Sequence, residues 1–409
     1  MKFLFIHQNF PGQFLHLSKE LVRRNHEVIA LTLNHRRLPS DWSGIKIIEY
    51  EFVKGNGKDI FELAVDFESK TIRGASCYLK ALELRDEGYS PDVIISHPGW
   101  GESLFLKQVW PNSILKIYCE WYYHTSGRDV MFEPEFENQA QLYLPRVIAK
   151  NSSLLLHSEQ AYSCISPTVW QASTFPDHFK KKISIIHDGI DTDTVKPDAN
   201  STLILDKDRK FSRKDEIITF VARSLEPYRG FHILMRSLPD LLKQRENLKV
   251  LIVGDDGVSY GGSPPKGYSW KKLFLEEIRP LLNDQQHRRI FFLGKLPYES
   301  YKALLCVSTV HVYLTYPFVL SWSLLEAMSS ACAIVASRTS PVEEVIRSGD
   351  TGILVDFFDH KSVAEQTLEL LADSNKRRML GSNAREYVKE NYDLKTKCLP
   401  EQVSWAEAL

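Results

Sequence analysis

Short apolar runs alternate with amphipathic stretches along the whole chain. In the first half we interpret KFLFIHQ, HEVIALTL, DVIISH, LKIYC and SLLLHS as strands, and QFLHLSKELVRR has the spacing of a helix. In the second half the runs are IITFVA, LKVLIVG, RIFFLG, VHVYLT, AIVAS and GILVD, each separated by a helical stretch. Strands that alternate with helices predict parallel sheets built from right-handed crossovers. The pattern therefore predicts an α/β fold with two doubly wound units in tandem.

A polar stretch separates the two halves. The segment IIHDGIDTDTVKPDANSTLILDKDRKFSRKDE is rich in Asp, Lys, Ser and Pro, which is typical of a linker. We expect an N-terminal domain over 1–190, a linker at about 190–212, a C-terminal domain over 191–385, and a helical tail over 386–409 that packs back on the N-terminal domain. A length of 409 residues fits two domains. Ligands of open parallel sheets bind beyond the carboxyl ends of the strands, so two facing units predict a cleft between them.

Charge and cysteine usage narrow the classes of partner. A formal net charge of -1 argues against a nucleic-acid-binding protein, which needs an excess of Lys and Arg. No apolar run is long enough for a signal peptide or a membrane span, and the scattered cysteines are typical of reduced thiols, so we expect a cytoplasmic protein. Peripheral membrane contact through the helix at 13–24 stays open, although a core-facing helix is the better interpretation. The cysteines are Cys77, Cys119, Cys164, Cys306, Cys332 and Cys398.

Two loops that follow predicted strands carry charged residues. In ARSLEPYRGF, Arg223 and Arg229 flank a short loop, and Gly230 opens a helix. Two guanidinium groups beside a helix N-terminus suit a diphosphate, because they supply permanent charge and forked donors. On this loop alone, two solvated surface arginines are the better interpretation.

The second loop lies in YPFVLSWSLLEAM, an apolar stretch that holds one carboxylate, Glu326. The spacing Ser323-x-x-Glu326 fits a capping box, in which Glu326 would bond back to the Ser323 amide. Alternatively the helix begins earlier, near Leu320, and Glu326 points into the cleft, where a carboxylate can bind two neighbouring hydroxyls such as those of a ribose. Both interpretations stay open on spacing alone.

Taken together and in order, these motifs resemble a known family. The series ARSLEPYRGF, LIVGDD, FFLGKLP, SWSLLEAMSSACAIVAS, SPVEEVI and GDTGILVD is similar to the nucleotide-sugar half of the family-4 retaining glycosyltransferases, which have the GT-B fold of two facing Rossmann-like domains. IIHDGIDTDTVKPD resembles that family's crossover, and the N-terminal stretch with HQNFPGQF resembles one subset of it. The resemblance covers nearly the whole chain.

The resemblance implies roles for particular positions. Arg223 and Arg229 would bind the donor diphosphate, with Arg229 standing where the family usually has lysine, and Glu326 would hold the nucleotide ribose. Further donor contacts would come from the loop after the first strand (Gly12), from a loop against the base (Gly294, Lys295, Leu296) and from the residues before the helix (Phe318, Val319, Leu320, Ser321).

Two positions depart from the family's pattern. The first glutamate of its E-x7-E pair, which touches sugar hydroxyls, falls at Phe318, and the glycines after it are replaced. A histidine common at the end of an N-domain strand falls on or near Glu120. Both departures concern the sugar and leave the phosphate and ribose contacts intact.

The resemblance implies a metal-independent, retaining hexosyltransferase with no cofactor. Its donor would be a nucleotide-sugar, a UDP-sugar first and GDP-mannose second, and its acceptor a glycan, a lipid-linked glycan or a small molecule, as in surface polysaccharide synthesis. Charge developing on the leaving diphosphate would be stabilised by the two arginines and a helix N-terminus. The diphosphate would itself accept the acceptor's proton, and Glu120 is the candidate nucleophile if one is used.

Other residues and functions stay open. His97 and Trp121 follow predicted strands and can contact sugar or acceptor, although a structural role is about as good for His97 and better for Trp121. Asp191-Thr192-Asp193 resembles a metal-binding D-x-D motif, but its place on the linker makes that poor. No G-x-G-x-x-G follows the first strand, which disfavours a dinucleotide oxidoreductase. A nucleotide-sugar-binding scaffold that has lost transfer is the second function class.

Overall fold

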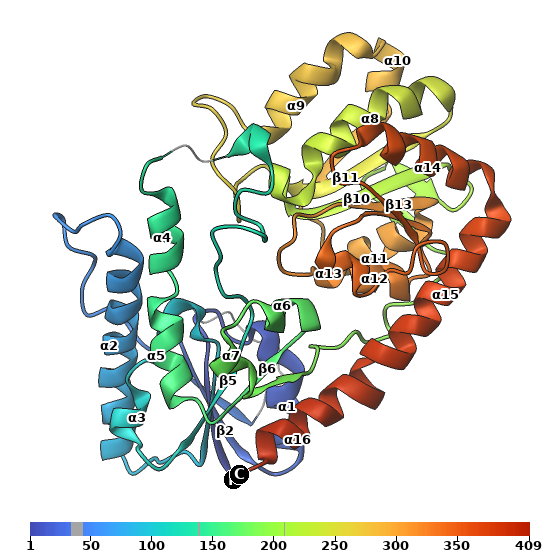
Figure 1. The fold of residues 1–409 in the computed structure, drawn as a ribbon. Helices are drawn as coiled ribbons and strands as arrows, with labels where there is room; N and C mark the ends of the chain where they lie inside the picture. Colours follow the sequence, from blue (N-terminus) through green and yellow to red (C-terminus); the bar gives the residue numbers. More distant parts are fainter. Residues whose placement is uncertain (34–43, 138–139, 208) are drawn as a thin grey trace. The chain divides into compact units, whose positions relative to one another are not determined.

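The computed structural model describes residues 1–33, 44–137, 140–207 and 209–409. The chain divides into two compact units. Unit 1 comprises Met1–Val130, Gln139–Gly189 and Lys395–Leu409, and unit 2 comprises Met131–Asn138 and Ile190–Leu394. Each unit is a parallel sheet with helices packed on both faces (Figure 1). Two parallel α/β units are what the alternation of strands and helices predicts.

The sheet of unit 1 has seven strands in the order β3-β2-β1-β4-β5-β6-β7. Their bounds are β1 Lys2–Ile6, β2 Glu27–Thr32, β3 Ile45–Glu49, β4 Val93–Ser96, β5 Ile114–Tyr118, β6 Ser163–Ser166 and β7 Ile183–Ile185. The helices of this unit are α1 Leu15–Arg23, α2 Val65–Asp86, α3 Leu106–Val109, α4 Tyr143–Ala149, α5 Ser152–Gln160, α6 Val169–Ser173, α7 Asp177–Lys180 and α16 Leu399–Glu407.

The main sheet of unit 2 has six strands in the order β12-β11-β10-β13-β14-β15. Their bounds are β10 Ile217–Ser224, β11 Lys249–Asp255, β12 Ile290–Gly294, β13 Val310–Tyr313, β14 Ile334–Ser337 and β15 Ile353–Val355. The helices are α8 Phe231–Gln244, α9 Trp270–Ile278, α10 Asp284–His287, α11 Tyr298–Val307, α12 Trp322–Ser329, α13 Ser340–Glu343, α14 His360–Ala372 and α15 Ser374–Tyr392. All six strands predicted for this half are confirmed.

Strand alternation builds a core on each face of the sheet. On β1, Phe3 and Phe5 pack with α1 and α16, while Leu4 and Ile6 pack on the opposite face with α2. Successive side chains of a strand point to opposite faces, so a strand covered on both sides must be apolar throughout. This explains the continuous apolar runs KFLFI and VIIS, and it leaves the strand ends as the places for polar chemistry.

One predicted strand is wrong. The run SLLLHS lies in helix α5, and the strand of this region is β6, a few residues later. The run is rich in leucine, a good helix former, and carries no β-branched residue, and a short apolar run does not by itself distinguish a buried strand from a helix. The strands β3, β6 and β7 were not predicted either, and part of the expected linker forms a two-stranded sheet of β8 Thr202–Ile204 and β9 Lys210–Ser212.

The chain passes between the units more often than a single linker allows. Residues 131–137, inside the expected N-terminal domain, belong to unit 2, where Phe132 and Phe136 pack against its core. Unit 2 also continues to Leu394, so only the last fifteen residues of the expected tail belong to unit 1. There Val403, Trp405 and Ala406 join the core that α1 covers. The domain ranges expected from the sequence therefore need these two corrections.

The apolar side of helix α1 faces the core of unit 1. Phe14, Leu17 and Leu21 are buried in the core of unit 1. On the polar side Glu20 accepts from Arg23 at 2.7 Å and from Arg24 at 3.1 Å. The core-facing interpretation of this helix is confirmed. No helix among the described residues is long and apolar enough to cross a membrane.

Candidate functional site

Arg229 is held at the carboxyl end of the sheet of unit 2. A short 3-10 helix, Pro227–Arg229, and Gly230, with φ of 67°, turn the chain from β10 into α8. The Arg229 guanidinium donates to Thr315 Oγ1 at 2.8 Å and to the Val319 carbonyl at 3.1 Å, and its side chain is 7% exposed. Both acceptors lie in the loop between β13 and α12. A cation fixed in this way at a helix N-terminus is a suitable partner for an anionic group.

The ring of Tyr260 lies over this guanidinium, with 5.1 Å between the guanidinium carbon and the ring centroid. The ring of Phe318 lies at 6.0 Å from the same carbon. Tyr228 contacts both, since its ring centroid is 5.2 Å from that of Phe318 and 6.1 Å from that of Tyr260. Arg229 is therefore surrounded by aromatic rings, which attract a cation through their negative faces. Phe318 is 8% exposed and takes part in this packing.

Glu226 fixes the loop that carries Tyr260. Its carboxylate is fully buried and accepts from the backbone amides of Ser259 at 3.2 Å, Tyr260 at 3.2 Å and Gly261 at 3.1 Å. The Ser224 and Ser259 hydroxyls, 2.6 Å apart, add a second link. Neither Glu226 nor Tyr260 was predicted from the sequence. The only signal was a carboxylate between two arginines, which reads equally well as a solvated charge.

Arg223 differs from Arg229 in its surroundings. It lies near the end of β10 and is exposed. The structure therefore brings both arginines to the carboxyl end of one strand, as predicted, but fixes only Arg229. An exposed guanidinium keeps its donors for a ligand, whereas the donors of Arg229 are partly used within the protein.

Glu326 is bound by two tyrosines of α11. Tyr298 donates its hydroxyl to Glu326 Oε1 at 2.8 Å, and Tyr301 donates to Oε2 at 2.9 Å. Burial raises the pKa of Glu326, and the two tyrosine hydrogen bonds act in the opposite direction. The capping box predicted as one alternative is wrong, because α12 begins at Trp322 with Ser321 as its N-cap. The ribose-binding alternative placed the start of the helix near Leu320, and α12 begins later than that, at Trp322.

The residues before α12 form a fixed corner. The Val319 carbonyl accepts from Arg229, Leu320 is buried, and the Ser321 amide donates to the Tyr313 hydroxyl at 3.1 Å. The backbone of Tyr316 is tied to that of Tyr228 by an amide-to-carbonyl bond of 3.0 Å. The structure thus brings 318–321 next to Arg229, although these residues lie about 90 positions apart in the chain.

The loop after β12 lies open. Gly294 has φ of 63° and is exposed, so a residue with a side chain would be strained there. Lys295 forms an ion pair with Asp255 at the end of β11, and Leu296 packs against the core of unit 2. Gly294 ends β12, the strand next to β11, and Lys295 and Leu296 follow it at the carboxyl end of the sheet. Their contact with the base stays a prediction.

Unit 1 carries a polar network at the carboxyl ends of three neighbouring strands. His7, His97 and Glu120 follow β1, β4 and β5, respectively. His7 Nδ1 accepts from the Asn9 amide at 3.0 Å, so its Nε2 carries the proton and donates to Gln13 Oε1 at 3.0 Å. Gln13 then donates to Glu120 Oε1 at 3.2 Å.

The second oxygen of Glu120 faces His97. His97 Nδ1 accepts from the Gly99 amide at 3.2 Å, so its Nε2 carries the proton, 3.4 Å from Glu120 Oε2. Burial alone would raise the pKa of Glu120, but His97, His7 and Gln13 together lower it below its usual range. Burial, with the charge of His97, lowers the pKa of His7 to about 3. The network therefore presents an ionised carboxylate beside neutral His7, which suits hydroxyl binding more than proton removal.

Gly12 lies against the His7 ring of this network, and Trp121 follows Glu120 in the chain. A Cβ on Gly12, whose φ is 49°, would lie 2.2 Å from His7 Nε2, so only glycine lets the loop pass this ring. Trp121 is 6% exposed and its ring packs 6.2 Å from that of Trp170. Trp121 is therefore a core residue, which agrees with the interpretation favoured from the sequence. His7 and Gln13, in the stretch HQNFPGQF, were not predicted as site residues.

No group of acidic, His and Cys side chains able to hold a metal ion occurs within residues 1–33, 44–137, 140–207 and 209–409. In the Asp191-Thr192-Asp193 stretch, where a metal-binding D-x-D motif was judged a poor interpretation, the Asp191 carboxylate accepts from the Asp193 amide at 3.2 Å, and the Thr192 hydroxyl donates to Asp393 at 2.5 Å. These contacts hold the chain where it passes between units. All six cysteines are buried.

Sequence comparison matches two family models in tandem. Residues 24–195 match "Glycosyl transferase family 4 group", and residues 204–387 match "Glycosyl transferases group 1". An uncharacterised glycosyltransferase of Methanocaldococcus jannaschii is 28% identical over 65% of this chain and 62% of its own length. An N-acetyl-alpha-D-glucosaminyl L-malate synthase of Bacillus anthracis is 36% identical over 25% of this chain and 27% of its own length. The chain spans less than two thirds of the length of these curated relatives.

Structural comparison covers nearly the whole chain. The Anabaena protein HepE in complex with UDP superimposes with a TM-score of 0.68 and 14% identity over 99% of both chains. WaaG, a glycosyltransferase involved in lipopolysaccharide biosynthesis, gives a TM-score of 0.68 with 15% identity over 100% of both chains. At this identity the likeness concerns the fold. Together the tandem family matches and the two parallel α/β units place the chain among the family-4 glycosyltransferases with the GT-B fold.

Proposed function

We propose that this protein is a retaining glycosyltransferase that moves a hexose from a nucleotide-sugar to an acceptor hydroxyl without a metal ion or cofactor. The donor would be a UDP-sugar in the first place and GDP-mannose in the second. The acceptor would be a glycan, a lipid-linked glycan or a small molecule, and the product would enter surface polysaccharides or glycoconjugates. The protein would act in the cytoplasm, with peripheral membrane contact where the acceptor is a lipid.

The surroundings of Arg229 carry the proposal. A buried guanidinium at the start of α8, within the residues that match the group 1 model, is suited to the diphosphate of a donor. Arg223, exposed on the same strand end, would bind the second phosphate. Glu326 would bind the ribose hydroxyls through lone pairs that its tyrosine partners leave open, and Gly294 to Leu296 would lie against the base. The similar Anabaena protein HepE forms complexes with UDP and with UDP-glucose, which supports a uridine donor for this chain.

In unit 1 we assign the acceptor to the Glu120 network. A carboxylate that already accepts one bond on Oε1 and faces His97 on Oε2 has lone pairs left for a hydroxyl. Because the pKa of Glu120 is lowered, its carboxylate is a poor base at neutral pH. Glu120 would therefore orient the acceptor, and His97 would position Glu120.

The transfer step then follows without a protein nucleophile. The bond between the anomeric carbon and the diphosphate oxygen breaks, and the acceptor oxygen bonds to the same face of that carbon. The acceptor's proton passes to the diphosphate oxygen that leaves. Arg223, Arg229 and the N-terminal amides of α8 would stabilise the charge that develops on the diphosphate.

Thermal shift tests the donor site directly. We would measure the melting temperature with UDP, GDP, ADP and their common sugars, because a ligand at a hundredfold above its Kd adds about 2.7 kcal/mol of stability. A shift with one nucleotide, lost in Arg223→Gln, is the expected result. No shift with any nucleotide would remove the donor assignment.

Two further measurements test the mechanism. Turnover of the donor identified above should persist in the presence of a chelator, and a loss would contradict the metal-free proposal. Glu120→Gln should raise the acceptor KM with a smaller effect on kcat, because an amide still offers one acceptor oxygen. A loss of more than about a thousandfold in kcat, with rescue by azide, would instead point to Glu120 as a nucleophile.

A second function is a nucleotide-sugar-binding scaffold that has lost transfer. Phe318 favours it, because a phenyl ring cannot accept the hydroxyl hydrogen bonds that a carboxylate at this position would accept. Nucleotide binding without turnover of any tested donor and acceptor would support the scaffold, whereas product formation would exclude it.

A further inference from the structure

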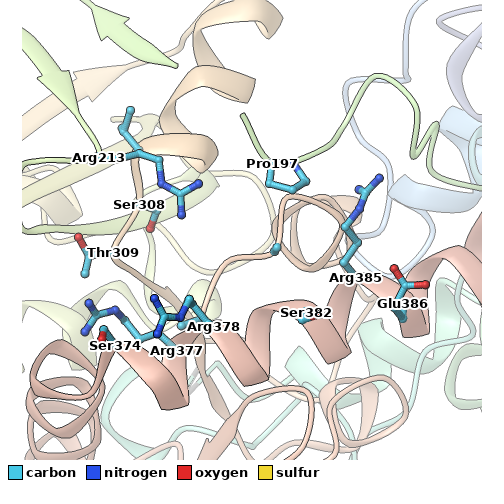
Figure 2. A pocket seen from close by; sticks show the side chains of 13 residues that line it. Pro197, Arg213, Ser308, Thr309, Ser374, Arg377, Arg378, Ser382, Arg385 and Glu386 are labelled. Atoms are coloured by element: carbon cyan, nitrogen blue, oxygen red, sulfur yellow. The ribbon is translucent and has the colours of Figure 1, made fainter. Parts of the chain in front are cut away.

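A pocket of ≈ 420 Å³ lies in unit 2, and none of the proposed donor-site residues lines it. Its walls are formed by the residues that precede three strands and by one side of α15 (Figure 2). Four arginines line it: Arg213, Arg377, Arg378 and Arg385. The volume falls in the range of small-molecule sites.

This pocket lies at the opposite edge of the sheet from the proposed donor site. Arg213 precedes β10, Ser308 and Thr309 precede β13, and Ala333 precedes β14. These strands are parallel, so their amino-terminal ends lie together on one side of the sheet. Their carboxyl-terminal ends, where Arg229 lies, are on the opposite side. At about 3.3 Å per residue, the length of β10 alone separates the two edges by roughly 20 Å.

The charge of the pocket is one-sided. The lining residues include four guanidinium groups and one carboxylate, that of Glu386. Glu386 is itself paired with Lys389, 3.1 Å away. Ordinary protein surfaces intersperse both signs, because like charges gathered in one concavity repel each other. A chain with a net charge of -1 that gathers four arginines here is suited to an anionic ligand.

Two of the arginines are built into the wall. Arg377 donates to the Leu370 carbonyl at 2.5 Å and the Leu371 carbonyl at 2.8 Å, at the end of α14. Burial lowers the pKa of Arg377, but its value stays far above neutrality because an arginine is always protonated in proteins. Arg385 donates to the carbonyls of Ser329 at 2.5 Å and Thr192 at 3.1 Å. Their charges are therefore fixed in position.

The other two arginines keep donors for a ligand. Arg213 is exposed, and Arg378, also exposed, donates to the side chain of Asn375. Within the part of the chain that the structure describes, neither forms a salt bridge with a carboxylate. Figure 2 shows Arg213 reaching in from one wall, with Arg377 and Arg378 on α15 across from it. The start of α15 adds little, because Asp373 already caps its Asn375 and Lys376 amides.

We propose that this pocket is a second anion site, which binds the phosphate or diphosphate group of a small metabolite or of a lipid headgroup. Arg213 and Arg378 bind the phosphate oxygens directly, and Arg377 and Arg385 supply fixed positive charge beneath them. The planar forks of guanidinium groups match phosphate geometry. Four positive charges favour a phosphate, which carries up to two negative charges and more acceptor oxygens, over a singly charged carboxylate.

The ligand would act on the segment that leaves unit 1. Arg385 donates to the carbonyls of Thr192 and Val195, which follow the passage between units at Ile190. An anion that binds at this pocket attracts Arg385 and partly neutralises its charge, so it changes the strength of the bonds that hold that segment. The site is therefore suited to regulation rather than to transfer, and it does not depend on the proposed donor chemistry.

Calorimetry with inorganic pyrophosphate tests the site on the full chain. The double variant Arg213→Gln/Arg378→Gln should bind pyrophosphate at this pocket at least about tenfold more weakly, since it loses two charged donors. Both side chains are exposed, so the variant should melt as the wild type does without ligand. Arg223→Gln, which alters the donor site, should keep this binding.

A matched control removes two exposed cations elsewhere, with Lys243→Gln/Arg288→Gln. Equal loss in this control, or pyrophosphate binding that disappears only in Arg223→Gln, would overturn the proposal. Co-sedimentation with phosphatidylcholine vesicles, with and without phosphatidic acid, identifies the source of the phosphate. Retention on the acidic vesicles that requires Arg213 and Arg378 supports a lipid headgroup, and pyrophosphate binding without such retention supports a soluble metabolite.

Discussion

Glu226→Ala tests how the loop over Arg229 is held. The carboxylate of Glu226 is fully buried and accepts from three successive backbone amides, those of Ser259, Tyr260 and Gly261, at 3.1 to 3.3 Å. Alanine leaves all three amides without this acceptor. The loop should therefore open more often, and Tyr260 should lose its fixed place over the guanidinium.

The size of the effect follows from the number of bonds. A hydrogen bond to a charged group contributes about 1.5 kcal/mol at the lower end of its range, which fits the length of these bonds. Three such bonds to one carboxylate are not fully additive, so we expect a loss of about 3 kcal/mol in the free energy of local opening. At 1.4 kcal/mol for each factor of ten, amide exchange at 259–261 should accelerate roughly a hundredfold.

Hydrogen exchange measured by mass spectrometry on peptides that cover this loop reports local opening without the need for two-state unfolding. Glu276→Ala is the control, because Glu276 is exposed and its ion pair with Lys272 is a long contact of 3.9 Å. The exchange of the loop should accelerate in Glu226→Ala and stay unchanged in the control. Unchanged exchange in Glu226→Ala would refute the view that this carboxylate holds the loop.

Three further predictions concern single residues. Glu326→Gln should weaken binding of the cognate nucleotide about tenfold in thermal-shift titrations, more than Tyr298→Phe, and equal affinity would exclude a ribose contact. Phe318→Glu should raise the affinity for the sugar-nucleotide relative to the free nucleotide about tenfold, and an unchanged ratio would separate Phe318 from the sugar. The pKa of His7 is lowered to about 3 from an ordinary value near 6.5. The contribution of neutral His7 to the free energy of unfolding is therefore complete above pH 6.5 and is lost as the pH falls toward 3. Between pH 6.5 and 5 the free energy of unfolding should fall by about 2 kcal/mol because of His7, and this part of the fall should be absent in His7→Asn. The same dependence of unfolding free energy on pH in both proteins would contradict the lowered pKa.

Much of the fold could be predicted from local pattern. The six strands of unit 2 are apolar runs between helical stretches, and burial on both faces of a parallel sheet is what makes such runs continuous. The α5 region was misassigned because LLL satisfies both a strand and a helix, and only its packing decides between them. Residues 131–137 were assigned to the wrong unit, because a segment's neighbours in space leave no trace in local periodicity.

The candidate site divides in the same way. Arg223, Arg229 and Glu326 could be located because they follow strands, and the carboxyl ends of parallel strands share one edge. Their partners could not: Tyr298 and Tyr301 precede Glu326 by more than 20 residues, and Glu226 meets its three amides about 33 residues later. Those pairings depend on how the crossover connections place different strands and helices next to each other, and a short stretch of sequence does not specify that.

The sequence by itself determined the alternation of strands and helices, the two-unit organisation and the family, because these depend on local hydrophobic period and on ordered motifs. The tertiary structure decided what each charge is bonded to. It surrounded Arg229 with aromatic rings, joined Glu120 to His97 and Gln13, and gathered four arginines at the far edge of the sheet. The physical reason is that the pKa and the interaction energy of a charged side chain depend on its burial and its partners. Both are set by contacts between residues far apart in the chain.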